Sequence, residues 1–112
     1  MENKLILVSS DTIGQGSKEL GEVLIENFFT ILKQNESLPK VIFLINSGVL
    51  LLSENNLVSP HLEELAAKGV EILACKTCLD YYKLTENLTI GNISTMKTLV
   101  ELATTMEVIT IN

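Results

Sequence analysis

Short runs of consecutive apolar residues recur along this chain, and stretches with helical spacing separate them. The clearest runs are residues 4–9, 40–45, 70–74 and 107–111, and residues 87–90 form a further strand candidate. Strands buried on both faces read as continuous apolar runs, because neither face meets water. Strands that alternate with helices are typical of a parallel sheet covered on both sides. The pattern therefore predicts an α/β protein, a three-layer α/β/α sandwich with a mainly parallel sheet of about five strands.

The first expected helix begins after the N-cap Ser17 and extends to about Lys33. Several of its apolar residues follow the spacing of one helix face, which we expect to be buried. Ile25 and Phe29 fall beside that stripe, and we expect them to reach a neighbouring element or another subunit. The residues of the predicted buried stripe are Leu20, Val23, Leu24, Phe28, Ile31 and Leu32.

Two later helices have clear boundary signals. One has Ser59 as its expected N-cap and Pro60 at the first helical position, and it extends to about Lys68 and stops at Gly69. The other begins after Ser94 as its N-cap and extends to about Thr105.

Composition narrows the range of possible partners. The 112 residues contain no linker rich in Pro, Gly or Ser, so we expect a single domain over residues 1–112. The net charge of −6 argues against nucleic-acid binding. The mean hydropathy of +0.34 predicts a homo-oligomer whose interface uses Ile25, Phe29 and residues 49–52. No apolar run approaches the roughly 18 residues of a membrane span and no cleavable signal is visible, so we expect a cytoplasmic protein without a membrane partner.

The segment Cys75-Lys76-Thr77-Cys78 holds both cysteines of the chain. It lies where the third apolar run ends and a short helix begins, with Thr77 as expected N-cap and Asp80 at the capping-box position. Thiols at a helix start lie near the positive end of the helix dipole, and Lys76 adds a positive charge. Both effects favour the reactive thiolate. In the cytosol, cysteines at this spacing are typical of reduced, reactive thiols rather than of a structural disulfide.

Several interpretations of the cysteine pair stay open. The pair suits sulfur transfer, and it also suits a thiol–disulfide oxidoreductase. In a non-catalytic oligomeric interaction module, the same cysteines would be small buried apolar residues. A zinc site needs three or four ligands, and His61 is the one further candidate, so we expect no metal. The glycines near residue 15 do not predict a dinucleotide site, because Glu19 replaces the third glycine of that motif, and we expect no cofactor.

The predicted sheet also indicates where a pocket would form. In parallel sheets, ligands and catalytic groups gather beyond the carboxyl ends of the strands. The loops at 9–16, 46–49 and 75–78 should meet at that edge. Beside the cysteines, the expected pocket-lining residues are Ser10, Asp11, Asn46, Ser47, Gly48 and Thr77.

Four segments together resemble a known family. They are residues 9–16 (SSDTIGQG), 43–49 (FLINSGV), 68–73 (KGVEIL) and 75–82 (CKTCLDYY). They resemble the C-terminal domain of YedF-type selenium-metabolism proteins, which is similar to the wider DsrE/TusD superfamily of sulfur relay. The resemblance implies a flavodoxin-like sheet, an oligomer and a carrier cysteine after the third strand that holds a persulfide.

By position, the resemblance maps the carrier cysteine onto Cys75, and Cys78 would be a possible resolving thiol. It also implies that a small TusA-like protein donates the sulfur, or selenium, from another chain.

Overall fold

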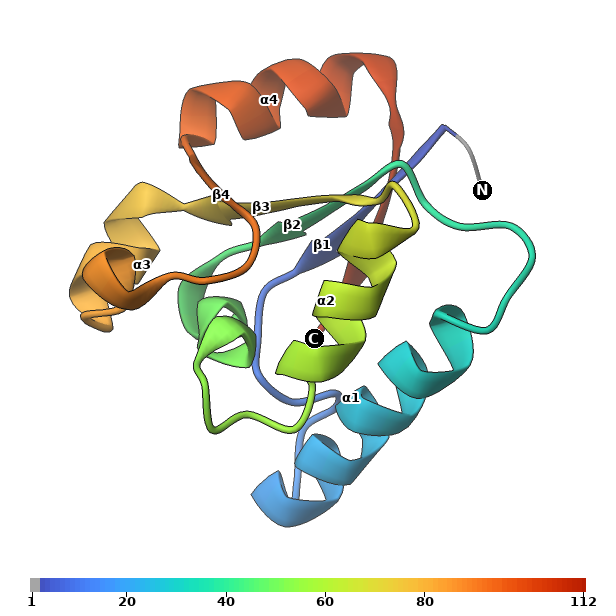
Figure 1. The fold of residues 1–112 in the computed structure, drawn as a ribbon, viewed down its shortest axis with the longest axis vertical. Coiled ribbons are helices and arrows are strands. Elements are labelled where there is room, and N and C mark those ends of the chain that lie inside the picture. The colour runs from blue at the N-terminus through green and yellow to red at the C-terminus, as the bar shows by residue number, and fades with distance from the viewer. Residues whose placement is uncertain (1–2) are drawn as a thin grey trace.

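The computed structural model describes residues 3–112 and shows a five-stranded sheet between two layers of helices (Figure 1). The strand order is β4-β3-β2-β1-β5, and every neighbouring pair is parallel. The predicted three-layer α/β/α sandwich is confirmed. The strands are β1 (Lys4–Val8), β2 (Val41–Leu44), β3 (Glu71–Cys75), β4 (Asn92–Ser94) and β5 (Glu107–Ile111).

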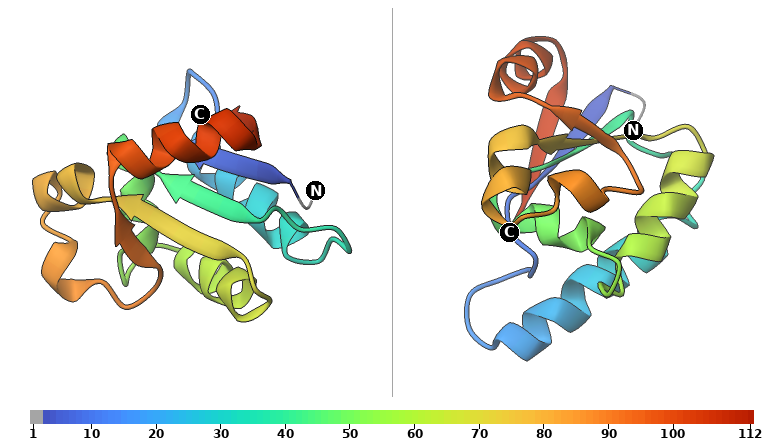
Figure 2. Two further views of the ribbon diagram at one scale, coloured as in Figure 1. Left: turned by 90° about the horizontal axis from the view of Figure 1, so that it is seen from above. Right: turned by 60° about the vertical axis from the view of Figure 1, so that its left-hand side comes forward.

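The helices divide unequally between the two faces of the sheet. Helices α1 and α2 cover one face, and α4 covers the other alone (Figure 2). The chain moves across the sheet in one direction from β1 to β4, and α4 then carries it back to β5 at the opposite edge. Because parallel crossovers are right-handed, this reversal places α4 on the opposite face. The bounds are α1 (Lys18–Leu32), α2 (Ser59–Ala67), α3 (Lys76–Tyr81), α4 (Met96–Thr105) and the short 3-10 helices η1 (Asn46–Leu52) and η2 (Thr85–Asn87).

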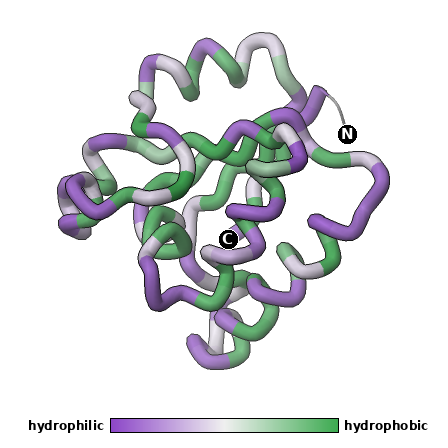
Figure 3. The backbone as a smooth tube through the Cα atoms, viewed as in Figure 1, coloured by the Kyte–Doolittle hydropathy of each residue, from purple (hydrophilic) through white to green (hydrophobic). Residues whose placement is uncertain are grey.

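Alternate strand residues feed two separate hydrophobic clusters. Ile6, Ile42 and Ile72 point to the α1–α2 face, where η1 also packs. Leu5, Phe43 and Leu73 point to the α4 face. The central strands β1, β2 and β3 are therefore mostly hydrophobic, whereas the helices alternate between hydrophobic and hydrophilic residues (Figure 3). Burial on both faces explains these three continuous apolar runs, as predicted. The apolar run of β5 is an exception, because β5 lies at the edge of the sheet and is largely exposed.

Helix α1 buries a face that coincides with the predicted one only at its C-terminal end, where Leu32 is buried and Phe28 packs against the core. Ile25 is 1% exposed and Phe29 is fully buried, whereas the expected inward residue Ile31 is 68% exposed. The cause is a close contact at Gly21, where an added Cβ would lie 2.7 Å from the Thr12 Cβ. The face that carries Gly21 therefore approaches the preceding loop most closely. The remaining exposed residues of the predicted stripe are Leu20, Val23 and Leu24.

The residues predicted to form the oligomer interface are consequently wrong. Ile25, Phe29, Val49 and Leu51 all lie in the hydrophobic cluster beneath α1 and α2. Their side chains fill the core of this chain and do not reach a surface. The apolar surface that α1 leaves exposed is instead the stripe that begins at Leu20.

Several boundaries also differ from their predicted positions. Ser17 caps α1 as expected, because its hydroxyl accepts a hydrogen bond from the Leu20 N–H at 3.2 Å. Helix α4 is capped by Thr95 rather than Ser94, since Ser94 is already the last residue of β4. In α2, Val58 rather than Ser59 occupies the N-cap position, because Ser59 is already the first helical residue. The strand expected at residues 87–90 is absent there, and the pairing with β3 begins at Asn92.

The burial of α1 gives a prediction with a matched control. Ile25→Ala is expected to lower the free energy of unfolding by about 2–5 kcal/mol, because it opens a cavity in the core. Ile31→Ala removes the same atoms from the exposed side of the same helix, so a change within about 0.5 kcal/mol is expected. Urea unfolding followed by circular dichroism measures both. Equal losses, or a larger loss for Ile31→Ala, would contradict this orientation of α1.

Candidate functional site

The loops that follow β1, β2 and β3 lie together at one edge of the sheet, as predicted. The Asp11 N–H donates to the Ser47 hydroxyl at 3.3 Å, and the Ile45 N–H donates to the Val8 carbonyl at 3.0 Å. The backbone N–H of Asn46 reaches the Cys78 sulfur at 3.0 Å. Backbone hydrogen bonds thus connect the three loops, and the cysteines occupy one side of this junction.

The two cysteines differ strongly in accessibility. Cys75 is the last residue of β3, and its side chain is 3% exposed in the cluster beneath α4. Cys78 lies one turn on in α3, is partly exposed and packs against both hydrophobic clusters. Both cysteines are free. The site therefore has one screened thiol and one thiol that a partner can reach.

An apolar cavity of about 470 Å³ opens beside Cys78. Met96 reaches it from the start of α4, and Tyr81, which is 78% exposed, forms part of its rim. The ring of Tyr81 packs edge-to-face on Tyr82, with ring centroids 5.0 Å apart. The complete lining consists of Ile45, Asn46, Thr77, Cys78, Tyr81, Tyr82 and Met96. The residues absent from the predicted lining are Ile45, Tyr81, Tyr82 and Met96. Met96 comes from a segment with no motif, whereas the other three lie in segments that carry the family resemblance.

Asn46 adopts a backbone conformation that directs its N–H at the Cys78 sulfur. Its φ of +50° lies in the left-handed region, which asparagine tolerates better than most residues. Its side-chain oxygen is 3.5 Å from the hydroxyl of Tyr82. The sequence placed Asn46 at the pocket, and the structure adds that its backbone N–H contacts the sulfur.

The electrostatics at Cys78 differ from the prediction. Burial raises the pKa of the Cys78 thiol above its usual value, and the neighbouring Cys75 thiol adds to the rise. The Asn46 N–H lowers that pKa and offsets only part of the increase. The expectation that the helix start makes both thiols acidic is therefore wrong for Cys78.

Two local features explain this difference. The ammonium group of Lys76 pairs with the Asp80 carboxylate at 2.8 Å instead of facing a thiol. This ion pair, together with the Thr85 hydroxyl, holds the pKa of Asp80 below its usual value. Asp80 consequently does not form the predicted capping box, and Cys75 rather than Thr77 occupies the N-cap position of α3.

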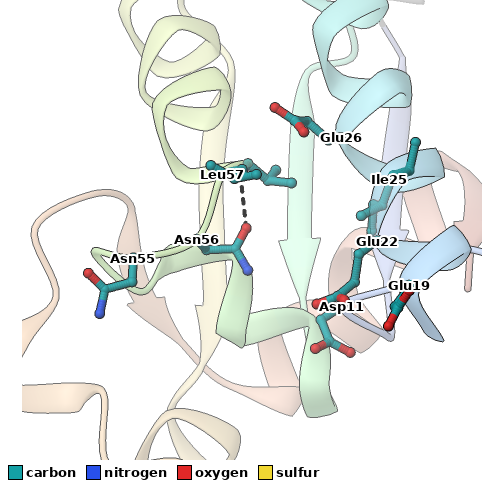
Figure 4. Close-up of a pocket in the computed structure, with 10 residues that line it drawn as sticks. Asp11, Glu19, Glu22, Ile25, Glu26, Asn55, Asn56 and Leu57 are labelled. Atoms are coloured by element: carbon teal, nitrogen blue, oxygen red, sulfur yellow. Dashed lines mark hydrogen bonds between the residues drawn. The ribbon is translucent and has the colours of Figure 1, made fainter.

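The remaining predicted pocket residues lie elsewhere on the same edge. Asp11 lines a second pocket of about 310 Å³ together with Glu19, Glu22 and Glu26 (Figure 4). Ser10 and Thr12 share a hydrogen bond between their hydroxyls at 3.1 Å. Gly48 is buried and, like Ser47 and Ser10, is absent from the lining of the cavity beside Cys78. Asn46 and Thr77 are the predicted lining residues that meet Cys78 there.

His61 belongs to α2 and faces α1, where its Nε2 is 3.2 Å from the Thr30 hydroxyl and 3.5 Å from the Glu26 carboxylate. Within residues 3–112, no group of three or more His, Cys, Asp or Glu residues is placed to hold a metal ion.

None of the helices described in that range is both long enough and apolar enough to cross a membrane.

The parallel sheet with a cysteine at the end of its third strand defines a class of small α/β thiol proteins. Residues 6–111 match the model of the DsrE/DsrF-like family, and the chain belongs to that family. No curated protein sequence matches the chain. The match does not extend to the YedF-type subgroup, which stays a prediction.

Solved structures show the same fold at low sequence identity. The ychN protein from E. coli is 22% identical, with a TM-score of 0.69 over 99% of this chain and 100% of that chain. MTH1491 from Methanobacterium thermoautotrophicum, described as a protein of unknown function, is 19% identical, with a TM-score of 0.70 over 98% and 99%. BT1422 from Bacteroides thetaiotaomicron, a conserved protein of unknown function, is 20% identical, with a TM-score of 0.64 over 97% and 95%.

The raised pKa of Cys78 predicts slow alkylation at neutral pH. A raised pKa lowers the thiolate fraction at pH 7, and the rate should climb as the pH rises through the folded-state pKa. Iodoacetamide rates from pH 6 to 10, followed by peptide mass spectrometry, measure this. The same chain unfolded in guanidinium is the control and should react faster at pH 7 at both cysteines. If Cys78 were alkylated faster in the folded chain than in the unfolded chain at pH 7, the pKa of its thiol would be lowered rather than raised.

The left-handed backbone of Asn46 predicts a residue-specific cost. Asn46→Gly should leave stability nearly unchanged, because glycine accepts this conformation. Asn46→Val should destabilise the fold by about 1–2 kcal/mol, because a β-branched residue resists it. Asn55→Val, at an exposed loop position, is the control. Denaturant unfolding measures all three, and equal stability of the two valine variants would refute the strain at residue 46.

Proposed function

We propose that this protein is a sulfur carrier that holds a persulfide on the Cys75–Cys78 pair. The DsrE-like family is generally linked to sulfur relay. The observation that carries the proposal is the arrangement of the thiols, since one is buried and the other borders an open cavity with an N–H on its sulfur. A carrier needs an accessible sulfur to receive its cargo and a protected environment to keep it.

The loading step requires no oxidant or reductant. The Cys78 thiolate attacks the terminal sulfur of a donor persulfide, R–S–SH. A sulfur–sulfur bond to Cys78 forms while the donor bond breaks, and the donor leaves as its thiolate. The Asn46 N–H, 3.0 Å from the Cys78 sulfur, favours the negative charge on the attacking atom. A selenium-bearing donor would deliver selenium through the same attack.

The accessibility of the two thiols favours an order of transfer different from the one implied by the family resemblance. That resemblance assigns the persulfide to Cys75 and the resolving role to Cys78. Because Cys75 is 3% exposed, we place the first attack at Cys78. Cys75 then either takes the terminal sulfur, or attacks the inner Cys78 sulfur to form a disulfide and release hydrosulfide. Both steps balance in atoms and electrons.

The partners form part of the same proposal. We propose a TusA-like donor on another chain and action in the cytoplasm, where thiols stay reduced. We also propose a homo-oligomer. The exposed stripe of α1 that includes Leu20, Leu24 and Ile31 supplies an apolar surface for a second subunit.

Thiol–disulfide exchange is the second candidate, because both cysteines are free and Cys78 packs against the cluster that contains Cys75. An oxidoreductase would cycle between dithiol and disulfide without gaining sulfur. The non-catalytic interaction module is the third interpretation, and the burial of Cys75 is compatible with it. Sulfur loading separates the proposed carrier from both.

Intact-mass spectrometry after exposure of the reduced protein to a low-molecular-weight persulfide tests the proposal. Wild type should gain one sulfur atom. Cys78→Ser should not gain sulfur. Cys75→Ser should still gain one sulfur atom, but the lifetime of its persulfide should differ from that of wild type. The double variant is the control for non-specific sulfur.

Each other outcome points elsewhere. Loading that survives Cys78→Ser and vanishes in Cys75→Ser would reverse the order proposed for the two thiols. Absence of any gain in wild type, with both thiols slow to alkylate, would favour the interaction module. A disulfide without sulfur gain would favour the oxidoreductase.

A further inference from the structure

We infer that the donor, proposed above as a TusA-like protein, presents its persulfide beside an uncharged, apolar group that occupies the cavity next to Cys78, and that anionic groups beside the donor persulfide are disfavoured. This inference rests on the proposed sulfur loading and names the class of substrate for that same site.

The first argument is the absence of charge in the cavity. None of the residues that line it in the described chain is ionic at neutral pH apart from the thiol itself. Near Cys78 along the chain, Lys76 is already paired with Asp80 at 2.8 Å. Lys97 follows the lining residue Met96 on α4, but it is exposed and is not itself part of the lining. Lys83 lines a separate pocket next to Glu86 and Asp80. A donor carboxylate or sulfonate would lose water at the cavity without gaining a partner, which is unfavourable.

The second argument is the chemistry of the apolar lining. Ile45 and Met96 offer aliphatic and thioether contacts, and Tyr81 and Tyr82 offer aromatic faces and edges. A volume of about 470 Å³ falls within the range of sites for small ligands. The cavity therefore suits an apolar group of the donor, such as a phenyl ring, held while the donor persulfide faces Cys78. A small persulfide with such a group can serve as a probe of this preference.

The third argument is that the cavity contacts the reacting atom directly. Cys78 is itself part of the lining, and Thr77 and Asn46 flank it. The apolar surroundings that raise the pKa of Cys78 are the same surroundings that would receive an apolar donor. The apolar surroundings of Cys78 would thus both select the donor and set the reactivity of the thiol.

The test compares two donors on the reduced wild-type protein. Benzyl hydropersulfide is uncharged, whereas glutathione persulfide carries carboxylates. Initial rates of sulfur gain are measured by intact mass, and each rate is divided by that of the same chain unfolded in guanidinium, which removes intrinsic donor reactivity. We expect the benzyl donor to be favoured by about tenfold, equivalent to about 1.4 kcal/mol.

A charge introduced at the rim should change this preference. Met96→Lys places a cation beside the cavity, so the preference for the benzyl donor should shrink or reverse as glutathione persulfide gains. Val100→Lys adds the same charge one turn later on α4, at an exposed position outside the lining, and should leave the ratio unchanged. Met96→Gln separates loss of apolar contact from gain of charge, and it should lower only the benzyl rate.

Each result decides between the two levels of the proposal. Equal normalised rates for the two donors, or faster loading from glutathione persulfide, would overturn the inference and leave the carrier intact. Identical ratios in Met96→Lys and Val100→Lys would overturn the role of the cavity. Absence of loading from either donor would overturn the carrier function itself.

Discussion

The site depends on how closely the turn after β2 approaches the carboxyl end of β1. A Cβ at Gly48 would lie 2.2 Å from the Val8 carbonyl oxygen, so only glycine fits there without a backbone shift. The Ile45 N–H binds that same carbonyl at 3.0 Å. These contacts hold the start of η1 against the sheet and fix Asn46, whose left-handed backbone then directs an N–H at Cys78. One close approach of two backbones thus positions the donor that faces the thiol.

The position of the site within the sheet also has a topological explanation. Open parallel sheets usually bind ligands where the strand order reverses, as in the 2-1-3-4-5 order of flavodoxin. In the order β4-β3-β2-β1-β5, the reversal lies between β1 and β5. Backbone hydrogen bonds close that position, from Gly14 N–H to Asn112 O at 2.9 Å and from Ser9 N–H to Ile111 O at 3.3 Å. The open space lies instead beyond β2 and β3, where the cysteines are.

The sequence was sufficient for the three central strands and for the meeting of the three loops, because both follow from strand burial and parallel pairing. The fourth strand was misplaced at residues 87–90, because the edge strand β4 is short, largely exposed and has no continuous apolar run. It was insufficient for the orientation of α1, since two apolar stripes lie side by side on that helix and a contact between Gly21 and Thr12 selects one. The acidity of Cys78 was mispredicted for a similar reason. Local sequence shows a helix start and Lys76, whereas burial and the Lys76–Asp80 pair arise only from the folded chain.

The environment of the thiols favours retention of sulfur over fast exchange. Thiol exchange depends on the thiolate fraction and on access to the sulfur. Burial lowers the thiolate fraction at Cys78 near neutral pH, and it blocks solvent from Cys75. Free thiols in solution would therefore exchange slowly with either cysteine. Under the proposed carrier function, a donor bound beside Cys78 would stay next to the sulfur until the thiolate forms. Slow intrinsic chemistry combined with a binding site would then make transfer selective for the donor that fits the cavity.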